Sequence, residues 1–169
     1  MKAMKTVKLT VWLVLLYVIQ TVFINLIKIN GVAPELILVF AVVYAFYERS
    51  FVFASYTAII CGMLAGCLMA NSFPLSVIII GIFGVIAFYA KNTLKFIPGI
   101  VRCIAVTALA SFLFIASHCF ITFKSIGMNS LFTEIFPYTI YTTAIVIAMY
   151  PFIGRVFFKE KDEKKLLLL

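Results

Sequence analysis

The stretch Ser50–Ala90, SFVFASYTAIICGMLAGCLMANSFPLSVIIIGIFGVIAFYA, contains no Asp, Glu, Lys or Arg. A helix needs about 20 apolar residues to cross a hydrocarbon core of about 30 Å, so this stretch is long enough for two crossings. We expect the break at Asn71–Pro74, because Asn and Ser compete for backbone hydrogen bonds and Pro cannot continue a helix. The sequence therefore predicts a pair of membrane helices over residues 51–70 and 73–90.

The chain on either side of this pair follows the same pattern. Apolar runs with few or no charges predict further helices over residues 9–27, 33–47, 100–123 and 131–154, and a charged tail follows at 155–169. We therefore predict a single membrane domain over residues 1–169, an all-α bundle of about six transmembrane helices. The helix over 33–47 is short, and if it only dips into the membrane, the sidedness of every later segment changes.

The composition agrees with an integral membrane protein. Of the 169 residues, 65% are hydrophobic and 12% are charged, and the mean hydropathy is +1.19. A soluble domain carries about 25% charged residues. Six crossings use most of the chain, which leaves no room for a water-soluble catalytic domain.

The charge distribution predicts the orientation. The net charge is +8, and basic residues gather on the cytoplasmic side of membrane proteins. If the N-terminus lies in the cytoplasm, all of the 14 Lys and Arg residues fall on the cytoplasmic side except Lys28 and Lys124. We therefore expect both termini in the cytoplasm. No basic segment interleaved with aromatic residues is present, so nucleic acid is not an expected partner.

Two polar residues within apolar segments are candidates for a function. Glu35 follows Pro34, which we expect in the first turn of the second helix. The carboxylate either contacts a partner or substrate near the outer surface, or stabilises its own helix at the positive end of the helix dipole. Gln20, in the outer half of the first helix, forms hydrogen bonds within the bundle or contacts a partner.

Small residues recur at steps of three or four along the helix over 51–70. They are Ser55, Ala58, Gly62, Ala65, Gly66 and Ala70. Gly62 and Gly66 have the GxxxG spacing, which lets another backbone approach closely. The neighbouring helix is either internal or part of another protein. Gly81 and Gly84 predict a similar close approach, directed toward the helix over 51–70.

The sequence lacks the groupings that catalysis needs. It has no Ser/His/Asp or Cys/His arrangement, no metal cluster and no phosphate-binding glycine loop. The four cysteines lie in apolar runs without metal-ligand spacing. We therefore expect neither an enzyme nor a bound cofactor or metal.

The segment Gly31–Leu38, GVAPELIL, resembles the MreD family of bacterial rod-shape-determining membrane proteins. That family has a Gly-x-x-Pro-Asp/Glu-Leu segment at the start of its second helix, a Gln in its first helix, and a glycine-rich third helix leading to a small-residue turn. Gly62, Gly66 and residues 71–75 are similar to the last feature, and the resemblance covers roughly residues 10–90. One departure is Ala70, which stands where family members often have an Asp.

The resemblance implies a non-enzymatic scaffold in the bacterial cell membrane. Such a protein binds the single-span protein MreC. Directly or indirectly, it also contacts MreB filaments and the glycosyltransferase and transpeptidase that extend peptidoglycan during elongation of the rod-shaped cell. Such a protein is embedded in the lipid bilayer. The hypothesised partner interface consists of Gln20, Pro34, Glu35, Ser55, Ala58, Gly62 and Gly66.

An alternative comes from another class of membrane protein. A six-helix protein of this size also resembles the substrate-binding component of an energy-coupling-factor vitamin transporter. In that case Glu35, Gln20 and Asn25 would line a pocket near the outer face. The predicted outer loops are short and poor in the polar and aromatic groups that fix a small ligand, which favours the scaffold.

Overall fold

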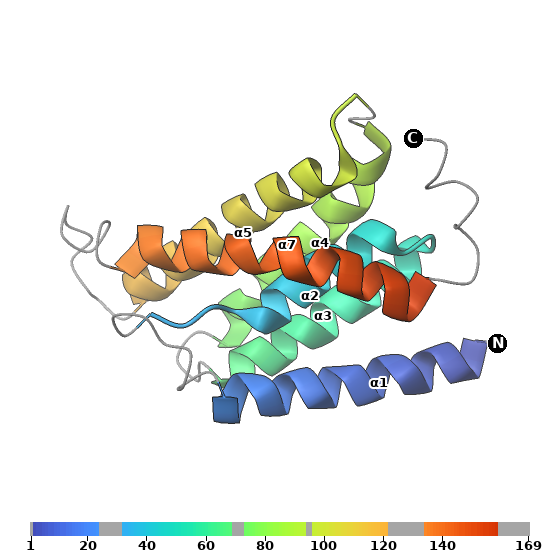
Figure 1. Cartoon of the computed structure of the whole chain (residues 1–169). Helices are drawn as coiled ribbons and strands as arrows, with labels where there is room; N and C mark the ends of the chain where they lie inside the picture. Colours follow the sequence, from blue (N-terminus) through green and yellow to red (C-terminus); the bar gives the residue numbers. More distant parts are fainter. Residues whose placement is uncertain (1, 24–31, 69–72, 94–95, 122–133, 159–169) are drawn as a thin grey trace.

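The computed structural model describes residues 2–23, 32–68, 73–93, 96–121 and 134–158, with the side chains of residues 2–5 and 23 left out, and these segments form a helical bundle (Figure 1). The elements are α1 (Lys2–Val18), which continues into the π-helix η1 (Ile19–Phe23), then α2 (Leu36–Tyr47), α3 (Phe51–Leu68), α4 (Phe73–Thr93), α5 (Gly99–Ile121) and α7 (Phe136–Phe158).

Each of the six predicted helices is found, with shifted ends. The first begins at Lys2 rather than at residue 9, since Lys is a good helix former and does not interrupt the helix. The last runs to Phe158 rather than to residue 154. The predicted ends of the helices over 9–27, 51–70 and 100–123, the predicted start of the helix over 131–154, and the tail from residue 159 lie outside the described residues.

The start of the second helix differs from the prediction. Pro34 was expected in the first helical turn, but α2 begins at Leu36 and Pro34 precedes it. Glu35 has φ −97° and ψ 91°, an extended conformation. The ring of Pro34 disfavours a helical conformation in the residue before it, so the chain enters α2 from a non-helical segment.

Four helices are long and apolar enough to cross a membrane, namely α3, α4, α5 and α7. The chain is therefore a multi-pass membrane protein. The 12 residues of α2 span only about 18 Å as a helix. Residues 32–35 run on in line with α2 (Figure 1), and at about 3.3 Å per residue they add roughly 13 Å. Together they match a hydrocarbon core of about 30 Å.

The central element is α2. Every residue from Ile37 to Phe46 is buried, and α3, α4, α5 and α7 all contact this helix. This explains why the α2 sequence, LILVFAVVYAFY, has no polar face, because a helix that is apolar all round is one that is covered all round.

Consecutive helices run in opposite directions, so the described chain starts and finishes at the same end of the bundle (Figure 1). Lys8 Nζ of α1 donates to the carbonyl of Val156 in α7, and the rings of Trp12 and Phe152 are 5.4 Å apart. These contacts agree with an even number of crossings. The side of the membrane that this end faces stays a prediction from the charge count.

Basic residues at this end cap helix C-termini. Arg102 Nη1 donates to the carbonyls of Ala90 (3.0 Å) and Lys91 (2.7 Å) near the end of α4. Lys91 Nζ donates to the carbonyl of Glu48 after α2. Cationic side chains thus satisfy carbonyl groups that have no partner within their own helix.

Candidate functional site

The hypothesised interface residues fall in two separate places. Gln20, Pro34 and Glu35 meet at the end of α2 that lies farthest from the termini, and Tyr138 and Thr142 of α7 join them there. We call Gln20, Glu35, Tyr138 and Thr142 the Glu35 cluster. Ser55, Ala58, Gly62 and Gly66 belong to the contact between α3 and α4 instead.

Gln20 connects the first helix to the start of α2. Its side chain is 6% exposed and lies on η1. The Nε2 atom donates to the carbonyl of Pro34 (3.1 Å) and to Oε2 of Glu35 (3.3 Å), while Oε1 accepts from the N–H of Leu36 at 2.9 Å. Of the two interpretations of Gln20, the structure shows the bond within the bundle.

Glu35 occupies the position before α2, but its side chain makes no hydrogen bond that caps this helix. Side chains from η1 and α7 cap the start of α2 instead. Gln20 accepts from Leu36 N–H, and Thr142 Oγ1 accepts from Glu35 N–H at 3.3 Å. The amides at the start of α2 would otherwise lack partners within the helix. The carboxylate of Glu35 is therefore available for another interaction.

Two buried polar atoms of the Glu35 cluster have no hydrogen-bond partner among the described residues. They are Oε1 of Glu35, which is 4% exposed, and the hydroxyl of Tyr138, which is also 4% exposed. Tyr138 interacts electrostatically with Glu35, and its hydroxyl also lies near that of Thr142, although without the geometry of a normal hydrogen bond. Buried polar groups are almost always paired, so two such atoms within one cluster indicate a place where another group could bind.

Sequence reasoning missed Tyr138 and Thr142. Both lie on α7, one helical turn apart, and Thr142 is 107 residues from Glu35 in the chain. The available signal was a Tyr and a Thr at i and i+4 on one face of an apolar helix, where polar side chains turn toward the bundle interior.

Buried residues on α1 form a regular seam that ends at Gln20. Leu9, Leu13, Leu16 and Gln20 are each less than 7% exposed, whereas Val7, Val11, Val14 and Val18 are exposed. The 4-3-4 spacing of the buried set is that of a coiled-coil seam. A single polar residue in such a seam fixes the register, and Gln20 does this for α1.

At the second place, glycines bring α3 and α4 into backbone contact. A Cβ added at Gly62 would lie 2.7 Å from Cα of Val77, and one at Gly66 would lie 3.0 Å from the carbonyl oxygen of Phe73. A Cβ at Gly84 would collide with Cβ of Ala58. The predicted close approach of Gly84 to the third helix is thus confirmed.

The small-residue face of α3 is consequently covered by α4 of the same chain. Ala58 is fully buried, and Gly62 and Gly66 are buried as well. The sequence left open whether this face packs against a helix of the same chain or of another protein, and in the described structure it packs against a helix of the same chain. Ala58, Gly62 and Gly66, which were part of the hypothesised partner interface, thus pack against α4 within the chain.

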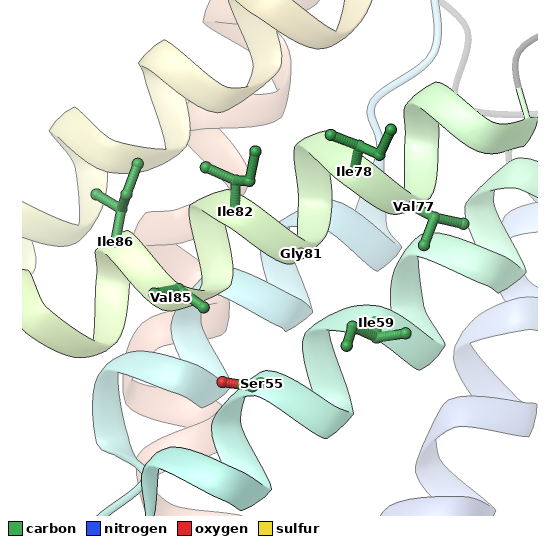
Figure 2. Close-up of a pocket in the computed structure, with 8 residues that line it drawn as sticks. All are labelled: Ser55, Ile59, Val77, Ile78, Gly81, Ile82, Val85 and Ile86. Carbon is green, nitrogen blue, oxygen red and sulfur yellow. The ribbon is translucent and has the colours of Figure 1, made fainter.

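An open groove of about 460 Å³ lies between α3 and α4, as Figure 2 shows. We call it the α3–α4 groove. Isoleucines of α4 follow one another along one side, Ile59 and Ser55 of α3 lie on the other, and Gly81 lies between them. The lining residues are Ser55, Ile59, Val77, Ile78, Gly81, Ile82, Val85 and Ile86.

Ser55 differs from other hydroxyl residues of the described helices. Thr57, Thr107 and Thr139 each donate to the carbonyl four residues earlier, at 2.8–2.9 Å. The hydroxyl of Ser55 is buried and has no partner among the described residues. Ser55 is the one residue with a polar side chain among those that line the α3–α4 groove.

A Cβ at Gly81 would find only Cγ1 of Ile59, at 3.8 Å, in contrast to Gly62, Gly66 and Gly84. The absent side chain of Gly81 thus hollows the groove without serving internal packing.

Within the described segments, no group of three His, Cys, Asp or Glu residues could hold a metal ion. Comparisons with protein-family models, curated proteins and solved structures find no match to this chain.

Proposed function

We propose that this chain is a non-enzymatic membrane scaffold that binds the transmembrane helix of a single-span protein in the α3–α4 groove. The observation that carries the proposal is Gly81, whose missing side chain opens the groove toward the outside rather than toward another helix of the bundle.

Association of helices in lipid supports this use of the groove. Lipid tails are as apolar as Leu or Ile, so hydrophobicity alone does not drive helices together there. Close van der Waals packing over small residues and hydrogen bonds between helices supply the free energy instead. The groove offers both, since it has Gly81 at its base and the unpaired Ser55 hydroxyl at its side.

The resemblance of GVAPELIL at 31–38 to the MreD family supports a specific role for the scaffold. The partner would then be MreC-like. The assembly would also include MreB-like filaments and the glycosyltransferase and transpeptidase of peptidoglycan synthesis, and it would determine rod shape. The chain would lie in the bacterial plasma membrane with both termini in the cytoplasm, where the basic end of the bundle favours them.

The transporter alternative draws support from a different observation. The Glu35 cluster contains two buried polar atoms without partners among the described residues, as a site for a small polar ligand would. In that case the α3–α4 groove would receive a helix of the transport subunit, and a purified chain would bind a vitamin.

Affinity purification of the tagged chain from native membranes in mild detergent, followed by mass spectrometry, separates these functions. We expect a single-span protein with a periplasmic coiled coil, together with wall-synthesis enzymes. Recovery of paired ATPases and a transport subunit would establish the transporter instead.

Gly81→Leu tests the groove itself, because leucine fills it while the α3–α4 contact stays intact. Ala105→Leu is the matched control, since Ala105 is exposed on α5 away from the groove. We expect Gly81→Leu to lose the partner and Ala105→Leu to retain it. Equal recovery with both variants would refute docking in the groove.

A further inference from the structure

The Glu35 carboxylate is the most deeply buried charged group at its end of the described bundle. It is 4% exposed, and its only described side-chain bond is the one from Gln20 Nε2 to Oε2. Its second oxygen, Oε1, has no donor among the described residues. An isolated buried charge is costly, so a buried carboxyl group is either protonated or paired with a cation.

No described Lys or Arg is shown to interact at this end, where the basic residue of the described helices is His118 in the last turn of α5, which has an interaction of its own. Lys8, Lys91 and Arg102 all interact at the opposite end, with Val156, Glu48 and the last carbonyls of α4. The cluster itself contributes Oε1 of Glu35, which accepts, and the hydroxyl of Tyr138, whose oxygen can accept while its proton donates. Two acceptors around one negative charge are matched by a group with several N–H donors and a positive charge.

We propose that the Glu35 cluster is a binding site for an ammonium or guanidinium group, held between Oε1 of Glu35 and the hydroxyl of Tyr138. Gln20 and Thr142 hold Glu35 in place through its Oε2 atom and its backbone N–H. A metal ion fits less well, because the cluster contains a single carboxylate and metal sites for hard cations use several oxygen ligands.

The source of the cation follows from the proposed function, on which this step rests. The α3–α4 groove extends to Val77, near the start of α4, which is the same end of the bundle at which Glu35 lies. A partner helix in the groove therefore emerges at this end of the bundle, and we expect a Lys or Arg in its following segment to supply the group. Lys28 and Lys124 of this chain, which lie outside the described residues, are the competing source.

The chemistry of the site can be measured on the purified chain in lipid nanodiscs. Dicyclohexylcarbodiimide adds to a protonated buried carboxyl group and leaves a stable acylurea that mass spectrometry detects. A bound cation keeps Glu35 ionised and slows this addition. We expect methylguanidinium or butylammonium chloride to slow labelling of Glu35 roughly tenfold, as a charged hydrogen bond would, and sodium chloride at the same concentration to have no such effect.

Two variants make this measurement specific. Tyr138→Phe removes the hydroxyl but keeps the ring, so we expect most of the protection to disappear. Tyr56→Phe makes the same change at an exposed tyrosine of α3 and should leave the protection intact. Three outcomes would overturn the proposal. Sodium chloride slows the labelling of Glu35 as much as the organic cations do, the protection of Glu35 persists in Tyr138→Phe, or Glu35 stays unreactive in every variant.

Further variants and the partner complex identify the source of the cation. If Glu35 reacts only after Lys28→Gln or Lys124→Gln, the cation comes from this chain. If it reacts freely in the isolated chain and is protected in the partner complex, the partner supplies the cation, and Glu35→Gln then lowers partner recovery while Glu134→Gln does not. Failure of the proposed function is a different outcome, because the wild-type chain would then recover no single-span partner at all.

Discussion

The α3–α4 pair is held together by backbone contact over glycines, whereas the η1 end of α1 is held by the hydrogen bonds of one glutamine. Both contacts hold helices together without a hydrophobic driving force, because helices in lipid gain little from hydrophobicity when they associate. The glycine contact depends on the lack of side chains at these positions, so it tolerates no added methyl group. The glutamine contact depends on three hydrogen bonds and can be weakened in steps.

The largest effect is expected at Gly84. Gly84→Ala places a methyl group against Cβ of Ala58, and such overpacking costs about 1–3 kcal/mol. Gly81→Ala, one turn away, places the same group 3.8 Å from Ile59 and should change stability by less than about 0.5 kcal/mol. Unfolding by denaturing detergent measures both. Equal losses would show that the two glycines do not differ as the structure indicates.

Gln20→Leu should have the next largest effect. It removes all three bonds that tie η1 to residues 34–36, at a cost of about 1–2 kcal/mol. Hydrogen exchange at the amide of Leu36 should rise, because that N–H loses its acceptor. Thr21→Val is the control, since the Thr21 hydroxyl donates only within its own helix. Unchanged exchange at Leu36 would contradict the role of Gln20 as a cap.

Thr142→Val should have a smaller effect. The N–H of Glu35 loses its acceptor, which costs about 1 kcal/mol, while the shape of the side chain is kept. Thr139→Val removes a hydroxyl that bonds within α7 and should cost less. The same detergent unfolding compares them, and a larger loss for Thr139→Val would argue against the link between α2 and α7.

The smallest effect on folding is expected at Ser55. Its hydroxyl has no described partner, so Ser55→Ala should leave the free energy of unfolding within about 0.5 kcal/mol of the wild type. Partner recovery should fall nonetheless if the hydroxyl bonds to a helix in the α3–α4 groove. A loss of stability above about 1 kcal/mol would show that Ser55 already has a structural partner.

Most of the secondary structure could be predicted because the membrane imposes it. Long apolar runs such as Ser50–Ala90 must be helical in lipid, where every backbone group needs a partner within the segment. The start of α2 was displaced by two or three residues since the conformation around Pro34 depends on what satisfies the following amides. Gln20 and Thr142 do this, and neither is a neighbour of Pro34 in the chain.

The candidate sites were predictable only in part. The polarity of Gln20 and Glu35 within apolar segments singled them out, but their bond to each other required the fold. The glycine spacing on α3 predicted a tight contact without its partner. Tyr138 and Thr142 were missed although they share one face of α7, and the α3–α4 groove was missed because a gap between two helices leaves no signal in the sequence.

The sequence alone therefore determined that this chain is a helical membrane protein, since hydropathy and charge act segment by segment and need no knowledge of neighbouring helices. Tertiary structure decided which helix is central, that α4 covers the glycines of α3, and that Glu35 bonds to Gln20 and Thr142. These features depend on distances between segments far apart in the chain, and only the packing of the whole bundle sets those distances.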